Sequence, residues 1–158
     1  MKFRDLKKEG HWPTLLAAFL YFDFSFMMWT MLGPLATEIN ESLTQRGFAM
    51  NDDQTATLLA VPVLAGAILR LVLGVFVDKF GPKKTAIVSQ IIVIATLFYG
   101  YLSADTISYN ELLFVALGLG FAGASFAVAL PQAGQWYPPR LQGTVLGIAG
   151  AGNIGVVI

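Results

Sequence analysis

The 158-residue chain contains no cysteine and only one histidine, His11. The lack of cysteine excludes disulfides, thiolate metal sites and thiol catalysis. Charged residues are scarce as well, at 13% of the chain, whereas soluble domains carry about 25%. Positive and negative charges balance, so no general basic field indicates a nucleic-acid partner. These shortages favour a membrane protein over a soluble domain.

Catalytic motifs are also missing. The sequence has no Walker loop, no H-E-x-x-H and no nucleophile elbow. The segment from Gly150 to Gly155 does match the dinucleotide fingerprint G-x-G-x-x-G. It lies inside an apolar run and lacks the preceding strand that a dinucleotide fold requires. We therefore predict no enzyme, no metal and no cofactor.

Long apolar runs fill most of the chain, which is 56% hydrophobic with a mean hydropathy of +0.65. A membrane-spanning helix needs about 20 apolar residues. Four complete runs cover residues 12–36, 55–77, 85–103 and 111–136, and a fifth covers 141–158. The polar stretch 37–54 is expected to connect the first two. We predict an all-α membrane protein with five transmembrane helices and, since the fifth run has no polar flank, the N-terminal part of a longer chain.

The basic residues predict the orientation, because cytoplasmic loops retain Lys and Arg. If the helices alternate, one side of the membrane receives most of them. These residues are Lys2, Arg4, Lys7, Lys8, Lys79, Lys83, Lys84 and Arg140. The opposite side receives Arg46 among several acids. We predict a multi-pass protein of the cell (inner) membrane with a cytoplasmic N-terminus.

Two charged residues, Arg70 and Asp23, lie deep inside predicted spans. A charge in a lipid-spanning helix costs about 3 kcal/mol or more, so it is usually functional or paired. Gly66 and Gly74 flank Arg70 at four-residue spacing, which indicates a bare stripe with room beside the guanidinium. Its fork can donate two parallel N–H bonds to a planar oxyanion. We favour an anion-binding Arg70 that faces a water-accessible cavity, and an ion pair with Asp23 is the alternative.

The stretch "GVFVDKFGPKK" resembles the loop between the second and third helices of major facilitator superfamily transporters. The residues that match are Gly74, Asp78, Lys79, Gly81, Lys83 and Lys84. The resemblance implies a gating role for Asp78, which would pair with neighbouring helix ends in one conformation only. The lysines have a simpler reading as anchors to the cytoplasmic headgroups.

A second stretch, "GLGFAGASFAVALPQAGQWYPPRLQGTVLGIAGAGNIGV", is similar to the signature of the nitrate/nitrite porters within that superfamily. The resemblance implies two six-helix halves, of which this chain is an incomplete N-terminal one, and a second arginine from the missing half. It also makes Phe126 a substrate contact. One departure is Ala149, where many members carry asparagine.

The last two apolar runs are rich in glycine, so much of their surface carries no side chain. Those of the signature are Gly120, Gly123, Gly143, Gly147, Gly150, Gly152 and Gly155. Small residues permit close helix contacts in lipid, and smooth faces also suit a rocking transporter. Asn153 is different, because an amide in an apolar helix needs a partner. It bonds either a neighbouring helix or the substrate.

The resemblance implies a secondary transporter that carries nitrate, or nitrite, by alternating access, with the lipid bilayer and the rest of the transporter as partners. The alternatives are a carrier of another small organic anion and a membrane interaction or sensor protein made of half a transporter. Asp23 is the acid that lies deep inside a predicted span. It is therefore our candidate for proton coupling, unless it pairs with Arg70.

Overall fold

The computed structural model describes residues 3–156, and within them the chain is helical without a strand. The helices are α1 (Phe3–Glu9), α2 (Trp12–Thr30), α3 (Leu32–Gln45), α4 (Asp52–Phe80), α5 (Pro82–Leu102), α6 (Tyr109–Gly123), α7 (Phe126–Gly134), α8 (Pro139–Gly150) and the 3-10 helix η1 (Ala151–Val156). The all-α class predicted from the apolar runs is confirmed.

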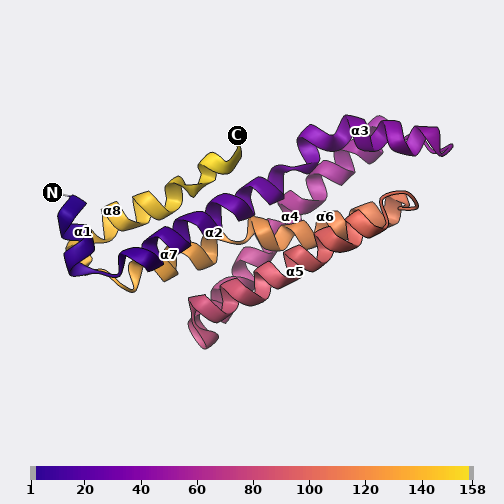
Figure 1. Ribbon diagram of the computed structural model, residues 1–158. Helices are drawn as coiled ribbons and strands as arrows, with labels where there is room; N and C mark the ends of the chain where they lie inside the picture. Colours follow the sequence, from indigo (N-terminus) through magenta and orange to yellow (C-terminus); the bar gives the residue numbers. More distant parts are fainter. Residues whose placement is uncertain (1–2, 157–158) are drawn as a thin grey trace.

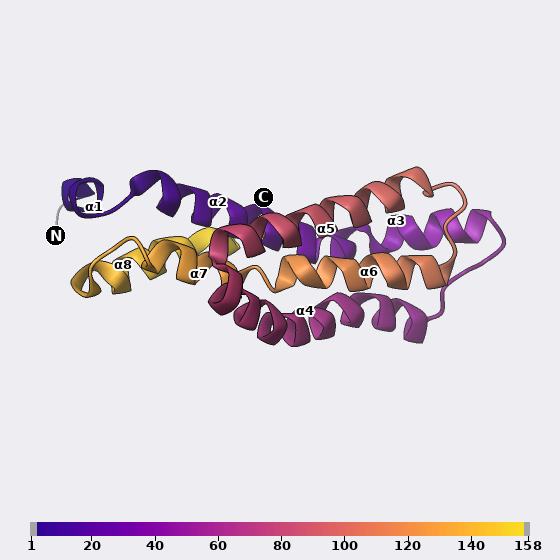
Figure 2. The ribbon, with the colours of Figure 1, turned by 90° about the horizontal axis from the view of Figure 1, so that it is seen from below.

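The helices form an elongated antiparallel bundle (Figures 1 and 2). α2 and α3 together make one long rod, α4 returns beside it, and α5 and then α6–α7 run back and forth along the same direction. In the described residues, four stretches are long and apolar enough to cross a membrane, namely Trp12–Gln45, Asp52–Phe80, Pro82–Leu102 and Tyr109–Gly134. Their lengths suit a bilayer core of about 30 Å.

The predicted fifth span, residues 141–158, is not a spanning helix in the part that the structure describes. α8 ends at Gly150 after 12 residues and continues as the 3-10 helix η1, while residues 157–158 lie outside the described range. Twelve residues extend about 18 Å, which is short of the bilayer core. Glycine lowers helix stability by about 1 kcal/mol relative to alanine, and Gly143, Gly147 and Gly150 all lie in this helix. The count of five spanning helices was therefore wrong.

The polar stretch 37–54, predicted as a connection, is helical as far as Gln45 and again from Asp52. Leu32, Ile39 and Leu43 recur at helical spacing, and they belong to a core that α3 shares with α4, α5 and α6. An amphipathic helix can thus carry a polar outer face and still bury an apolar stripe. The rod is interrupted at Met31, because Pro34 has no N–H to offer the carbonyl of Thr30 one turn earlier.

The α6–α7 rod is the central element of the bundle. Its most apolar stretch is 61% buried, against 28% for each of the other three spans. α6 packs along α4 and also contacts α5 and α2. The rod is broken at Ala124–Ser125, between α6 and α7, and not at Pro131, which lies inside α7 although proline is a common cause of helix kinks. The break lies where the candidate site is assembled.

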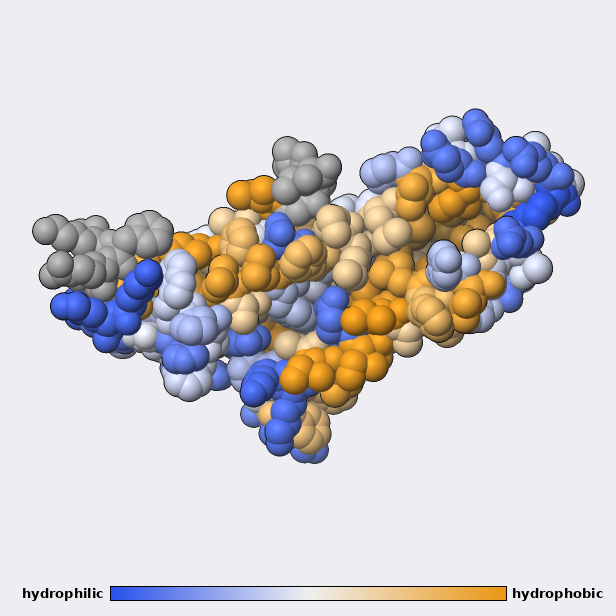
Figure 3. All heavy atoms as spheres, in the orientation of Figure 1, coloured by the Kyte–Doolittle hydropathy of each residue, from blue (hydrophilic) through white to orange (hydrophobic). Residues whose placement is uncertain are grey.

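The outer faces of the bundle are apolar in the middle and polar at the ends. Figure 3 shows this pattern on one face. On α4, Leu64, Ile68 and Leu71 are exposed, and on α5, Ile91 and Ile94 are exposed. Apolar helix faces without protein cover are what a lipid environment accommodates.

Two buried serines in the bundle differ in how their hydroxyls are satisfied. Ser89 pairs with the Tyr21 hydroxyl at 2.8 Å and donates to the Ala86 carbonyl at 3.1 Å. Ser125 is equally buried, yet its hydroxyl has no hydrogen-bond partner among the described residues. A buried hydroxyl without a partner contributes nothing that its removal would lose.

We therefore expect Ser89→Ala to lower the free energy of unfolding by about 1 kcal/mol, whereas Ser125→Ala should be neutral or slightly stabilising. Thermal unfolding of the two purified variants in detergent compares them directly. An equal loss in Ser125→Ala would show that the Ser125 hydroxyl is bonded after all.

Candidate functional site

Arg70 lies in the middle of α4 and reaches across to the α6–α7 break. Its Nη2 donates to the Gly123 carbonyl at 3.0 Å, and its guanidinium lies 5.7 Å from the centre of the Phe126 ring. An arginine carries five N–H donors, and this one bond to a described residue leaves the others available. The side chain is exposed rather than enclosed. The guanidinium is therefore held at one edge and open at the other.

The break explains why the Gly123 carbonyl is available. In a continuous helix this carbonyl would accept from the N–H four residues later, that of Ala127. Here the Ala127 N–H donates to Ala124 at 3.1 Å, and Ala129 donates to Ser125 at 2.8 Å. The Gly123 carbonyl, which has no helical donor, accepts a hydrogen bond from Arg70 instead. The arginine and the helix break thus stabilise each other.

Phe126 begins α7 and connects Arg70 to α2. Its ring meets the Phe22 ring edge to face, with centroids 5.5 Å apart. Contact of a guanidinium with an aromatic face is favourable by about 0.5–2 kcal/mol, depending on solvation. Phe126 is 38% exposed, so part of the ring remains open. The structure thus brings together two of the three predicted substrate contacts, Arg70 and Phe126.

Asp23 and Arg70 do not form an ion pair. Among the side chains that the structure describes, the pair within salt-bridge distance is Arg140 with Glu9. Asp23 is half-buried on α2. The alternative in which Asp23 neutralises Arg70 is therefore absent from this conformation, and both charges stay available for other roles.

Asn153 lies in η1, which crosses α2 beside Asp23. A Cβ placed on Gly152 would come within 2.7 Å of the Phe19 carbonyl oxygen and 3.0 Å of the Asp23 backbone nitrogen. The following residue, Asn153, is exposed, and within residues 3–156 its amide has no hydrogen-bond partner. The structure therefore shows no hydrogen bond between Asn153 and Arg70 among the described residues.

The signature glycines fall into two groups. A Cβ on Gly120 would lie 2.5 Å from Ala65 Cβ, and one on Gly123 would lie 2.4 Å from Trp29 Nε1. A Cβ on Gly143, Gly147 or Gly150 would meet no described atom within 4 Å. Close packing inside this chain thus explains Gly120, Gly123 and Gly152 but leaves the α8 glycines on an open face. Gly155 lies in η1.

The predicted bare stripe beside Arg70 is only half correct. Gly74 is open, with no described atom within 4 Å of a Cβ placed there. Gly66 is not, because a Cβ there would lie 3.3 Å from Trp29 Nε1 and 3.4 Å from Gly123 Cα. An indole, invisible in the local sequence, fills the space.

The segment from Gly74 to Lys84, predicted as a loop, comprises the end of α4, the single connecting residue Gly81 and the first turn of α5. Gly81 follows the last residue of α4 with φ +84° and ψ +154°, an extended conformation of positive φ that only glycine adopts readily and that costs other residues about 1–3 kcal/mol. This explains the glycine before Pro82. Asp78, Lys79, Lys83 and Lys84 are all exposed, and Lys79 lies over the Phe80 ring. In the described part of the chain Asp78 has no salt-bridge partner, so its proposed gating contacts are not made here.

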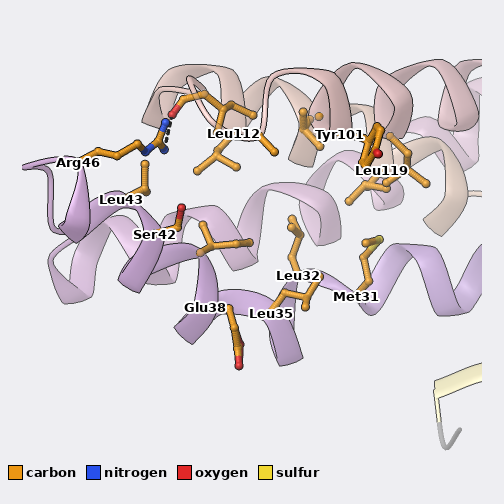
Figure 4. Close-up of a pocket in the computed structure, with 16 residues that line it drawn as sticks. Met31, Leu32, Leu35, Glu38, Ser42, Leu43, Arg46, Tyr101, Leu112 and Leu119 are labelled. Carbon is orange, nitrogen blue, oxygen red and sulfur yellow. Dashed lines mark hydrogen bonds between the residues drawn. The ribbon is translucent and has the colours of Figure 1, made fainter.

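A cavity of about 380 Å³ lies elsewhere, between α3, α5 and α6 (Figure 4). Its lining is mainly apolar, from residues such as Leu32, Leu43 and Leu112. Arg46 lies at its mouth and donates to the Ile107 carbonyl at 2.8 Å, while Glu38 points away from the hollow (Figure 4). Since polar groups do not converge in it, this cavity is not suited to a small anion.

The sequence did not predict two residues that lie near Arg70. Trp29 fills the space at Gly66 and Gly123, and Phe22 contacts Phe126. Both lie in an aromatic-rich run on α2. Aromatics in an apolar helix are commonly lipid-facing or core residues, so only the tertiary contact separates these two from their neighbours.

Comparison with known proteins identifies the family of this chain. Residues 14–158 match the family described as the Major Facilitator Superfamily. The chain is 34% identical over 139 residues to the probable nitrate/nitrite antiporter NarK1 of Thermus thermophilus, a match that covers 88% of this chain and 30% of that protein. It is 33% identical to the probable nitrate/nitrite transporter NarK2 of Mycobacterium tuberculosis, over 85% of this chain and 33% of that protein.

A third relative is the nitrate/nitrite transporter NarU of Salmonella typhimurium, 33% identical over 85% of this chain and 29% of the relative. The chain thus spans about a third of the length of these relatives. The resemblance indicated by the two sequence motifs is confirmed. The chain belongs to the major facilitator superfamily, and within it is similar to the nitrate/nitrite transporters.

Proposed function

We propose that the chain is an incomplete N-terminal six-helix half of a secondary transporter that moves nitrate, and also nitrite, by alternating access. Support comes from the relatives, whose names specify nitrate and nitrite. The observation that carries the proposal is the state of Arg70. One N–H of its guanidinium is fixed on Gly123, the ring of Phe126 lies beside it, and no acid neutralises it among the described residues.

The chemistry of the arrangement suits a small planar anion. A guanidinium donates two parallel bonds to an oxyanion, which lysine cannot reproduce. The aromatic ring offers an apolar wall that excludes water from one side of the ligand. The rest of the shell, including a second arginine, would come from the part of the transporter beyond this chain. Asn153 is a further candidate from this half.

The gating segment and the orientation belong to the same proposal. The N-terminus would be cytoplasmic, which places the exposed lysines of the α4–α5 turn at the cytoplasmic headgroups. Asp78 would pair with helix ends of the rest of the transporter in one conformation and release them in the other. Its exposure and lack of a described ion-pair partner leave it available for that contact.

Uptake of labelled nitrate into proteoliposomes by the full-length protein tests the function. Nitrate should enter and should be displaced by nitrite but not by small carboxylates such as acetate. Transport of a carboxylate without nitrate would favour a carrier of another organic anion. Stable expression of the 158-residue product without any transport partner would favour an interaction or sensor role.

Nitrate import must be coupled to another ion, because moving an anion into a negative cell costs about 2.3 kcal/mol per 100 mV. Proton symport and nitrate/nitrite exchange both meet this requirement. Asp23, half-buried beside η1 and unpaired with Arg70, is our candidate proton carrier. The variant Asp23→Asn is expected to lose accumulation driven by a pH gradient and to retain most nitrate/nitrite exchange.

The matched control is Asp105→Asn, since Asp105 is exposed in the α5–α6 connection. Both variants are measured in the same vesicles with an imposed pH gradient. Normal gradient-driven accumulation in Asp23→Asn would remove Asp23 from the coupling mechanism. Loss of exchange as well would show that Asp23 serves binding or folding instead.

A further inference from the structure

Trp29 lies where three helices meet, next to both ends of the Arg70 interaction. Its indole Nε1 on α2 donates to the Pro62 carbonyl on α4 at 2.9 Å. The same atom would lie 3.3 Å from a Cβ on Gly66 and 2.4 Å from a Cβ on Gly123. The ring thus occupies space that exists because these two positions carry no side chain.

The two glycines that accommodate the indole are directly connected to the site. Gly66 lies one turn before Arg70 on the same helix. Gly123 supplies the carbonyl oxygen that accepts the hydrogen bond from Arg70. A single side chain therefore sets the spacing between the helix that carries the guanidinium and the broken end of α6 that receives it.

Ring contacts lead from Trp29 to the other partner of Arg70. Trp29 meets Phe26 with centroids 5.2 Å apart, and Phe26 meets Phe22 at 5.5 Å. Phe22 in turn meets Phe126 at 5.5 Å, and Arg70 lies over that ring. Edge-to-face pairs of this kind are directional as well as apolar. Displacement of the indole therefore affects both groups that hold the guanidinium.

We propose that Trp29 is the positioning residue of the Arg70 site. It acts through Gly123 and Phe126 rather than on the substrate, and it fixes the guanidinium so that the unused N–H groups face the open side. The inference rests on the proposed function only in taking an anion as the ligand of those N–H groups. The orientation of Arg70 itself is a property of the substrate-free protein.

The test uses the full-length transporter with Trp29→Phe, which keeps an aromatic ring but loses the N–H donor. The control is Trp136→Phe, the same change at an exposed position that contacts His11. The first readout is the rate at which phenylglyoxal modifies Arg70 without substrate, followed by peptide mass spectrometry. Arg46, which also donates to a backbone carbonyl, is the internal reference.

We expect Trp29→Phe to raise the modification rate of Arg70 severalfold relative to Arg46, and Trp136→Phe to leave it unchanged. The second readout is nitrate uptake, where the KM of Trp29→Phe should rise about tenfold while turnover at saturating nitrate is retained. Lower thermal stability with an unchanged KM and unchanged Arg70 reactivity would overturn the proposal, since that result describes packing alone.

A second variant covers the case in which Trp29→Phe does not reach the membrane. Phe26→Leu removes the ring between Trp29 and Phe22 and should shift both readouts in the same direction by a smaller factor. Unchanged values in Phe26→Leu would contradict the role of the ring contacts. If the wild-type transporter carries no nitrate, the proposed function fails, whereas the reactivity of Arg70 still decides the role of Trp29.

Discussion

In the full-length transporter, Arg70→Lys is expected to lower the kcat/KM of nitrate transport about 100-fold, the effect of losing about 3 kcal/mol of charge-assisted hydrogen bonding. Lysine keeps the positive charge but not the planar fork. It would also lose the bond to the Gly123 carbonyl and the contact with Phe126 that orient the guanidinium. Membrane insertion should be unaffected, because the charge at this depth is the same.

Arg46→Lys is the matched control for this prediction. Arg46 likewise donates one Nη2 bond to a backbone carbonyl, that of Ile107, at 2.8 Å. It lies at the end of α3, where no substrate contact is proposed. Transport assays in vesicles with equal amounts of each variant separate the two. Wild-type nitrate transport by Arg70→Lys would refute Arg70 as the substrate ligand.

The unusual position of Arg70 was evident from the sequence, but its surroundings were not. A charge in an apolar run between two glycines is visible in the residues alone. The break at Ala124–Ser125 is not, because alanine and serine are common in helices and the stronger signal, Pro131, lies further along. At the break, a guanidinium that is distant in the chain donates to the carbonyl that lacks its helical donor. Only the tertiary structure joins these two facts.

The secondary structure was most predictable where apolar runs are long. Among the described residues, the four stretches that are long and apolar enough to cross a membrane correspond to the four complete runs. Charge and polarity misled the prediction after residue 36, since Glu38, Glu41 and Arg46 read as a loop although Leu32 and Leu43 are buried. At the other end, the fifth run was apolar enough to suggest a span, but hydropathy does not register the low helix stability of its glycines.

The sequence also does not reveal which of the signature glycines are packed against a neighbouring helix. The seven glycines look alike in the sequence, and packing was predicted for all of them. In the structure a Cβ on Gly120 or Gly123 would clash with a neighbouring helix, whereas a Cβ on Gly147 would meet no described atom within 4 Å. The open glycines Gly143, Gly147 and Gly150 belong to α8, so any partner that packs on them would be a surface outside the described bundle.

The contrast between packed and open glycines predicts a large loss of stability for Gly120→Ala. A Cβ at this position would lie 2.5 Å from Ala65 Cβ, 3.0 Å from the Ala65 carbonyl carbon and 3.1 Å from the Gly66 backbone nitrogen. Two of these atoms are backbone, so no flexible side chain can move aside, and α4 and α6 must separate. We expect a loss of about 2–3 kcal/mol in the free energy of unfolding, because this is the most extensive helix contact in the bundle.

The control is Gly100→Ala, another glycine within a helix at an interhelical contact. Its nearest neighbour would be Val115 Cγ2 at 3.5 Å, an ordinary van der Waals distance, and alanine favours the helix by about 1 kcal/mol. Gly100→Ala should therefore keep or raise the thermal midpoint of the purified protein in detergent, while Gly120→Ala lowers it and reduces the yield from membranes. Because α6 ends at Gly123, separation of α4 from α6 also moves the Gly123 carbonyl away from Arg70, which donates a hydrogen bond to it. The Gly120→Ala protein that can be purified should therefore bind nitrate more weakly than the wild type. If Gly120→Ala is as stable and as active as Gly100→Ala, the close approach of α4 and α6 does not maintain the site.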